Sequence, residues 1–421
     1  MNTRPNFKYP ICRVQYGMFL NWRGIVLGSA IVIFLCFSGY ANDLYARAQP
    51  SYQFDKALEE VADCTSEENA PVCARPSVRE LLSMKGGAEV MDALSDRITA
   101  QQCHYIGHVV GQQSFLKSRS IEGAIAQCNR TCDSACVHGI IGESFAQELG
   151  LGSPDDAPDF DLKHLSPAEL REIGTKLCES PETCHGVGHA LFQIFGEFEP
   201  GLAICRDVGT DTTELYCYQG LFMEYADVLY SRNMRPVADV EYPTLETLDS
   251  LCSLPTFEER RSCFRYFPRM VISTLEKNGS SPTQAMTRLR EICASYEEKD
   301  DEIACVVGIG VYSSYALAAN PQEAVRACER FTEPMDQSSC NLGQISVATQ
   351  DRQPKVLAYC AAVSNQSLKA SCFQAVFFFL NRLGVEMKGA ELLCPNDSVC
   401  EAEVKNYLLD PIQQIREKYA S

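Results

Sequence analysis

The stretch Ser281-Pro282-Thr283-Gln284-Ala285, which runs on to Ile292-Cys293, contains the pattern that decides the fold. Serine is a favoured N-cap residue and proline is favoured at the first helical position, so a helix is predicted from Pro282 to Cys293. After a polar loop, Cys305 opens a second, largely apolar segment that reaches Ala319. A segment that is apolar on most sides is typical of a helix packed between neighbouring helices.

This arrangement recurs along the chain. Ser166-Pro167 precedes a segment that ends at Cys178, and Asn320-Pro321 precedes one that ends at Cys328. Each closing cysteine is followed by an opening cysteine, and successive opening cysteines lie about 32–46 residues apart, which is the period of a helix-pair repeat. No stretch alternates as a strand would. The sequence therefore predicts an all-α fold, an α/α helix-pair solenoid with two antiparallel helices per repeat.

Cysteine is unusually common, with 22 in 421 residues. The Cys-x-x-Cys pairs of zinc ribbons are absent, and the close cysteines are 6–12 residues apart, which favours disulfides and an oxidising compartment. We predict inter-helix bridges between Cys64/Cys73, Cys178/Cys184, Cys205/Cys217, Cys252/Cys263, Cys293/Cys305, Cys328/Cys340, Cys360/Cys372 and Cys394/Cys400. Four cysteines remain in the expected exported part, Cys103, Cys128, Cys132 and Cys136, which form two bridges in any of three pairings, or one bridge and two thiols.

The N-terminus carries a basic segment followed by an apolar run. Four basic side chains lie in residues 1–23, and the apolar run from 24 to 41 reaches the lower length limit for a transmembrane helix. We expect residues 1–23 in the cytoplasm, 24–41 as a transmembrane signal anchor, and 42–100 as a linker with entry helices. A cleaved signal peptide is the alternative interpretation. Both place the bulk of the chain outside the cytoplasm, in the periplasm or the extracellular space.

Charge and length narrow the possible partners and the domain organisation. The formal net charge of −18 argues against nucleic acid and against binding to an anionic membrane surface. A chain of 421 residues is too long for one ordinary core. We predict histidine-bearing helical repeats over residues 101–235 and histidine-free helical repeats over residues 236–421.

The repeat pattern also carries a resemblance to a known family. The segment Ala327-Cys328, followed by Cys340-Asn341-Leu342-Gly343, resembles the cysteine-rich Sel1-like repeat proteins, which are related to TPR proteins. In that family a helix ends in Ala-Cys and the next begins Cys-x-x-Leu-Gly. The resemblance covers roughly residues 170–400, and it implies an α/α superhelix whose concave face binds a protein partner. Histidines are not a feature of the family.

Five of the six histidines fall in three places, each just after a cysteine. His104 and His108 form a pair at spacing i and i+4, His185 and His189 form a second pair, and His138 lies between the pairs. Residues at i and i+4 share one face of a helix, so each pair can bind a metal ion. Equivalent helices of adjacent repeats are neighbours, so we predict one metal site built from all five.

Small residues accompany the histidines. Glycines between and after them are expected to let the helices approach one another closely. These positions are Gly107, Gly111, Gly139, Gly142, Gly186 and Gly188.

Imidazole ligands favour a transition metal such as Cu, Zn or Fe. A b-type haem held by two histidines is a second option. Neither histidine pair has Glu after its first His, which disfavours a zincin peptidase, and no Cys-x-x-Cys-His motif exists for covalent haem. Glu143 and Glu224 are candidates to complete a histidine–carboxylate ligand set.

Two functions follow from these features. The first is an exported, membrane-anchored helical-repeat protein whose transition-metal site serves metal handling or metal-dependent redox chemistry. The alternative is a disulfide-stapled scaffold for protein–protein interaction with structural histidines. No catalytic motif decides whether the protein is an enzyme.

Overall fold

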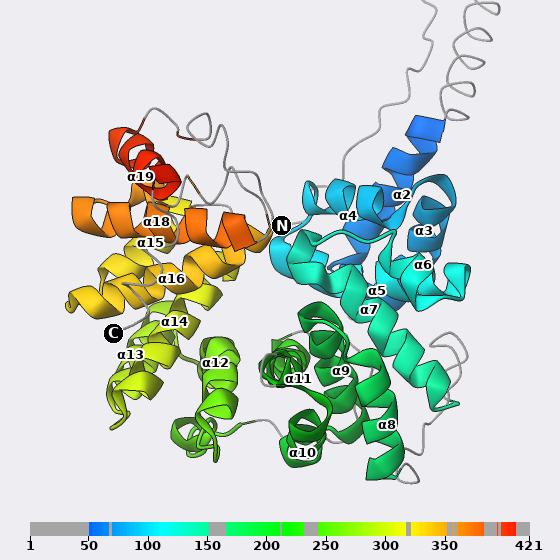
Figure 1. Ribbon diagram of the computed structural model, residues 1–421, viewed down its shortest axis with the longest axis horizontal. Coiled ribbons are helices and arrows are strands. Elements are labelled where there is room, and N and C mark those ends of the chain that lie inside the picture. The colour runs from blue at the N-terminus through cyan, green and yellow to red at the C-terminus, as the bar shows by residue number, and fades with distance from the viewer. Residues whose placement is uncertain are drawn as a thin grey trace, which may run out of the picture. The chain divides into compact units, whose positions relative to one another are not determined.

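The computed structural model describes residues 50–66, 70–150, 166–210, 213–230, 243–316, 321–351, 357, 360–382, 394 and 397–409 (Figure 1). The N-terminal segment 1–23 and the expected transmembrane anchor at 24–41 lie outside these residues. None of the helices within them combines the length and the apolar character needed to cross a bilayer. The anchor therefore stays a prediction.

All regular secondary structure in the described part of the chain is helical, which confirms the predicted all-α class. The helices up to residue 230 are α2 (Pro50–Cys64), α3 (Ala70–Met84), α4 (Gly87–Ser95), α5 (Ala100–Ser118), α6 (Ile121–Ile125), α7 (Thr131–Glu148), α8 (Pro167–Leu177), α9 (Pro181–Phe195), α10 (Phe198–Val208) and α11 (Glu214–Tyr230). Those that follow are the 3-10 helix η3 (Leu248–Ser250), α12 (Phe257–Lys277), α13 (Pro282–Ala294), α14 (Lys299–Ala316), α15 (Pro321–Glu329), α16 (Pro334–Asp351), α18 (Gln366–Arg382) and α19 (Ser398–Leu409).

Hydroxyl side chains begin these helices where the sequence predicts. The Ser281 hydroxyl accepts a hydrogen bond from the backbone N–H of Gln284, and Pro282 is the first residue of α13. Ser166 caps α8 in the same way through the N–H of Glu169. Each cap satisfies a donor that the first helical turn leaves unpaired, which fixes where the helix begins.

All twenty cysteines in the described residues are paired, in ten disulfides. The eight predicted bridges are confirmed, from Cys64–Cys73 to Cys394–Cys400. The four remaining cysteines pair as Cys103–Cys132 and Cys128–Cys136. Closing a loop of about a dozen residues stabilises a fold by on the order of 3 kcal/mol. The bridges therefore contribute strongly to holding consecutive helices together.

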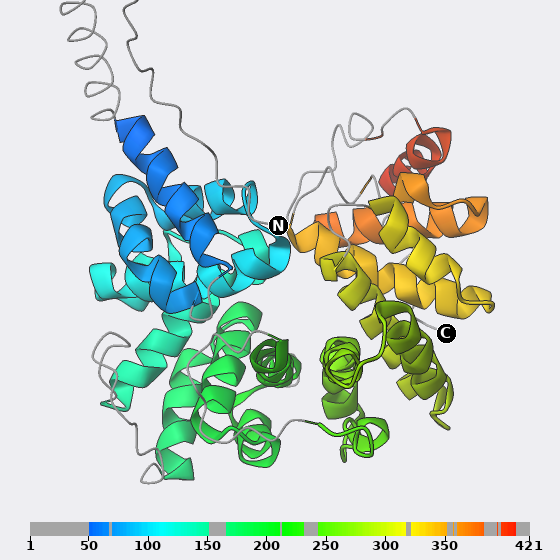
Figure 2. The same ribbon diagram turned by 180° about the vertical axis from the view of Figure 1, so that it is seen from behind.

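The long helices pack side by side in chain order (Figures 1 and 2). Helix α5 contacts α7, α7 contacts α9, and α9 contacts α11, and the succession continues through α12, α14, α16 and α18. The shorter helices α8, α10, α13 and α15 pack against members of this row. Residues Ala57–Ser421 form one compact unit, and buried apolar side chains from α7 to α16 form a continuous core. This order makes the three histidine-bearing helices α5, α7 and α9 consecutive neighbours.

Reciprocal glycines bring pairs of these helices into backbone contact. A Cβ atom at Gly111 of α5 would overlap the carbonyl oxygen of Cys136 in α7, and one at Gly139 of α7 would overlap the carbonyl oxygen of His108 in α5. The same reciprocal contacts join α9 to α11 and α14 to α16, at Gly188, Gly220, Gly310 and Gly343. The predicted close approach is thus confirmed at Gly139, whereas Gly142 would have nothing within 4 Å of its Cβ.

Helix α7 starts with a left-handed turn. Cys132, Asp133 and Ser134 have φ angles of 57°, 59° and 58°, a conformation that costs a non-glycine residue roughly 1–2 kcal/mol. Disulfides secure the turn: Cys132 is bonded to Cys103 of α5, and Cys128 is bonded to Cys136 one turn into α7. The turn aims the Cys132 carbonyl oxygen at His104.

Candidate metal centre

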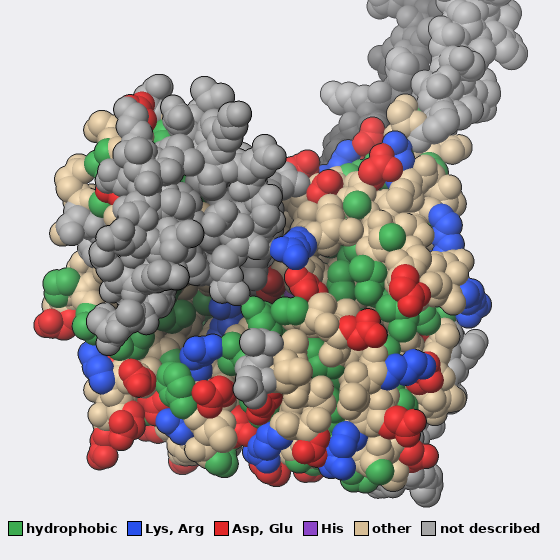
Figure 3. Space-filling model, viewed as in Figure 1, with side chains coloured by type: hydrophobic (Ala, Val, Ile, Leu, Met, Phe, Trp, Pro, Cys, Tyr) green, Lys and Arg blue, Asp and Glu red, His purple; other side chains and the backbone are tan. Residues whose placement is uncertain are grey.

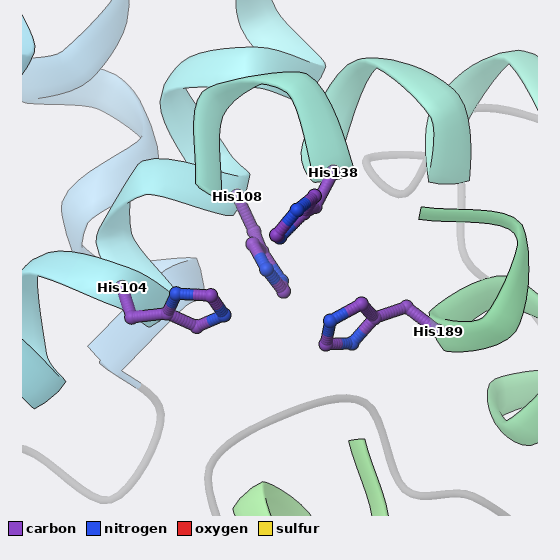
Figure 4. A group of neighbouring side chains, drawn as sticks. All are labelled: His104, His108, His138 and His189. Atoms are coloured by element: carbon purple, nitrogen blue, oxygen red, sulfur yellow. The ribbon is translucent and has the colours of Figure 1, made fainter. Parts of the chain in front are cut away.

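Four of the five predicted histidines converge in one buried place (Figure 4). His104 and His108 come from α5, His138 from α7 and His189 from α9. One ring nitrogen from each lies within 4.8 Å of the others. Their side chains are between 2% and 5% exposed, and no histidine side chain of the described residues is visible on the face of the molecule in Figure 3. The arrangement is a compact four-nitrogen set that is shielded from solvent.

Each of the four rings carries one buried nitrogen that has no hydrogen-bond partner among the described residues. These atoms are Nε2 of His104, His108 and His189, and Nδ1 of His138. A buried polar atom without a partner costs about 1–3 kcal/mol, and native proteins rarely leave several together. Nitrogens around a tetrahedral ion with bonds of about 2.0–2.1 Å lie roughly 3.4 Å apart. Small rotations of the rings would therefore close the set on one ion.

Hydrogen bonds at the outer nitrogens orient two of the rings. His104 Nδ1 donates to the Cys132 carbonyl oxygen at 2.9 Å, and His189 Nδ1 donates to Glu224 Oε2 at 2.6 Å. A carbonyl oxygen and an ionised carboxylate can only accept, so with Glu224 ionised and the rings neutral each Nδ1 carries the proton and each Nε2 carries a lone pair. Histidine ligands of metals typically have such outer partners. The two Nε2 lone pairs are therefore turned toward the site.

His185 lies beside the four-histidine set and outside it. Its ring is stacked on His138, with centroids 4.5 Å apart, and its centroid is 4.9 Å from that of His189. The side chain is buried, and its Nε2 also lacks a hydrogen-bond partner. The predicted five-histidine site is thus resolved into four converging rings and one neighbour.

Burial lowers the pKa of His104, His108, His138 and His185 and so favours their neutral form. It is the main cause that lowers the pKa of His104, although Asp227 and Asp133 oppose it. The pKa values of His108, His138 and His185 lie well below the ordinary range, first because of burial and second because each ring repels protons on the other histidines. Neutral imidazole is the form that binds metal, so the site is prepared for an ion at neutral pH.

The lowered pKa values predict that acid destabilises the metal-free protein. Histidines in the unfolded chain take up protons below about pH 6.5, whereas the buried rings do so only at lower pH. Stability is then fully present above pH 6.5 and falls as the pH decreases toward the folded-state pKa values, by up to about 1.4 kcal/mol per pH unit for each such ring. Urea unfolding at pH 7.5, 6.5, 5.5 and 5.0 measures this loss.

A single replacement provides the control for that measurement. In His185→Gln one titrating group is absent, so the decrease in unfolding free energy per pH unit should be smaller by up to about 1.4 kcal/mol. Carboxyl groups titrate mostly below this pH range. A stability that does not change between pH 6.5 and 5.0 in the metal-free protein would contradict the assignment of buried neutral rings.

The two carboxylates that the sequence suggests as ligands have different roles. Glu224 is fully buried and contacts His189 at Nδ1, the nitrogen that points away from the site. Glu143 accepts a hydrogen bond from Gln147 at 3.5 Å. The metal-binding group among the described residues consists of histidines alone. The expected ligand set combined histidines with a carboxylate. The group that could hold a metal ion instead contains four histidines, and the Glu224 carboxylate contacts the outer nitrogen of one of them, His189.

Two contributors were not predicted from the sequence. One is the Cys132 carbonyl oxygen, which depends on a backbone turn that no motif signals. The other is Gln193, whose Nε2 donates to Glu224 Oε1 at 3.0 Å. Gln193 is four residues after His189, so the spacing i and i+4 that identifies the histidine pairs also indicates it.

The spacing of the rings bears on which cofactor the site could hold. Ring centroids within the four-histidine set lie between 4.7 and 6.0 Å apart. A b-type haem held by two of these histidines stays a prediction. A single ion fits, and a four-nitrogen set suits Zn, Cu or Fe.

Comparison of the chain with protein-family models, with curated proteins and with solved structures finds no match. The resemblance to Sel1-like repeats stays a prediction. The residues of the site itself are therefore the basis for assigning a function.

Proposed function

We propose that the protein binds one transition-metal ion through His104, His108, His138 and His189. The observation that supports this most strongly is the convergence of four unpartnered ring nitrogens in a buried place. A purely structural role would leave all four nitrogens unsatisfied, at a cost of several kcal/mol in total. A metal ion satisfies them together.

The chemistry of the four imidazoles limits which metal ions can bind and what a bound ion can do. Imidazole suits Zn, Cu and Fe, whereas Mg and Ca prefer oxygen ligands. The burial of all four rings leaves little room for a substrate at the ion. This favours an ion that stays bound over one that is handed on. We therefore propose a resident ion ahead of metal handling, with metal-dependent redox chemistry as its use if the ion is Cu or Fe, since Zn has no redox chemistry.

The proposed location is outside the cytoplasm. Ten disulfides in one chain are typical of an oxidising compartment. The basic segment 1–23 and the apolar run 24–41 support a single-pass anchor with a cytoplasmic N-terminus. The scaffold alternative proposes a protein partner on the concave face of the helix-pair solenoid.

Metal analysis of the purified full-length protein tests the proposal. We expect about one ion of Zn, Cu or Fe per chain after purification without chelators or metal resins. After removal by a chelator, the same stoichiometry should return on titration with Zn²⁺. A protein that contains no metal and takes up none would overturn the proposal and leave the scaffold alternative.

A further inference from the structure

Glu224 is a fully buried carboxylate with an unusual set of partners. It lies on α11, and its side chain is 0% exposed. Oε2 accepts from His189 Nδ1 at 2.6 Å, and Oε1 accepts from Gln193 Nε2 at 3.0 Å. Neither partner carries a permanent positive charge. A buried carboxylate is costly unless a positive charge lies close to it.

Two other buried carboxylates among the described residues face arginines. Glu259, also 0% exposed, is bonded to Arg206 at 2.6 Å, and Asp227 is paired with Arg269. These pairs show how the fold usually compensates a buried negative charge. For Glu224, the place where a cation would lie is the other side of the His189 ring.

A comparison between two repeats of this chain also indicates that a cation lies near Glu224. Glu143 follows Cys136 at the same distance in sequence as Glu224 follows Cys217, and both glutamates lie on the second helix of a glycine-joined pair. Glu143 acts electrostatically on the guanidinium of Arg75, since it raises the pKa that burial lowers there. Glu224 occupies the equivalent position beside the histidine site.

We propose that Glu224 compensates the charge of the bound ion through His189 and makes the site prefer a divalent to a monovalent ion. This inference rests on the proposed metal site. The Coulomb attraction between the carboxylate and the ion is proportional to the charge of the ion, so removal of the carboxylate weakens binding of M²⁺ more than binding of M⁺. Glu224 is a positioning residue, because it acts through the ring of His189.

Affinities for Zn²⁺ and Cu⁺ test this inference. Both are measured by competition with chelators on the full-length wild type, Glu224→Gln, Glu224→Asp and the control Glu259→Gln. Glu224→Gln should lose at least tenfold more affinity for Zn²⁺ than for Cu⁺. A tenfold difference between the two copper ions corresponds to 59 mV, so the Cu²⁺/Cu⁺ potential of the loaded variant should rise by about this much or more. Glu224→Asp keeps the charge at a greater distance and should show a smaller change of the same sign.

The outcomes separate the two proposals. If the wild type binds neither ion, the metal site itself is wrong. If the wild type binds both, but Glu224→Gln weakens them equally or not at all, Glu224 is only structural and the inference is overturned. The control Glu259→Gln removes a buried carboxylate elsewhere. The inference is also overturned if this control changes the ratio of Zn²⁺ affinity to Cu⁺ affinity as much as Glu224→Gln does. If Glu224→Gln fails to fold, Glu224→Asp provides the test. A ratio of Zn²⁺ affinity to Cu⁺ affinity that is unchanged or increased in Glu224→Asp, relative to the wild type, overturns the inference.

Discussion

Replacing His189 by alanine should lower the affinity for Zn²⁺ more than about 100-fold, whereas replacing His185, one turn earlier on α9, should lower it less than about tenfold. His189 contributes one of the four converging nitrogens, and His185 only stacks beside them. Loss of an outer partner of a ligand typically costs 10- to 100-fold, so loss of a ligand should cost more. The pair His104→Ala/His108→Ala removes two ligands and should abolish binding.

The two single variants are matched controls for each other. Both remove a buried imidazole from the same helix, so a general loss of packing would affect them alike. Competition titration with a Zn²⁺ chelator gives the affinities, and far-ultraviolet circular dichroism checks the fold. Equal losses in two variants whose circular dichroism spectra match the wild type would instead favour the five-histidine site that the sequence predicts.

Gly139→Ala should destabilise the protein by about 3 kcal/mol and lose metal affinity, whereas Gly142→Ala should be neutral or gain up to about 1 kcal/mol. The new methyl group at Gly139 would meet the carbonyl oxygen of His108, a backbone atom that has no rotamer to move away. Helices α5 and α7 would then have to separate, which carries His138 away from the α5 histidines. At Gly142 the methyl group meets nothing within 4 Å.

Urea unfolding at pH 7.5 measures the stabilities, and a zinc titration on the same samples measures the site. The two glycines lie less than one turn apart on one helix, so helix propensity affects both and cancels in the comparison. A Gly139→Ala variant as stable as Gly142→Ala would show that the helices do not meet at this backbone contact.

The sequence predicts most of the fold because the same physical devices recur in it. Ser281 and Ser166 cap helices where the hydroxyl precedes Pro, and eight disulfides follow from cysteines that close one helix and open the next. The pairing of Cys103 with Cys132 could not be predicted. It depends on the left-handed turn at the start of α7, where Cys132, Asp133 and Ser134 have positive φ and no glycine marks the turn.

The site is predicted in its residues but not in its geometry. Helical spacing indicates which histidines share a face, and the repeat order indicates that α5, α7 and α9 are neighbours. The rotation of each helix about its own axis is set by core packing, which spacing does not report. That rotation places His189 in the set and His185 beside it, and it turns Glu224 to the outer nitrogen of His189.

The bridge between Cys103 and Cys132 bears on when and where an ion can enter. It secures the turn whose carbonyl oxygen orients His104, while Cys184, bonded to Cys178, immediately precedes His185 at the start of α9. For the proposed metal site, a newly made chain with reduced thiols lacks these fixed ring positions, so we expect oxidation to come before metal capture. The ion is then drawn from the metals present where the disulfides form. Affinity alone seldom selects among transition metals in cells. The compartment in which the disulfides form would therefore influence which metal the proposed site binds, in addition to the chemistry of its ligands.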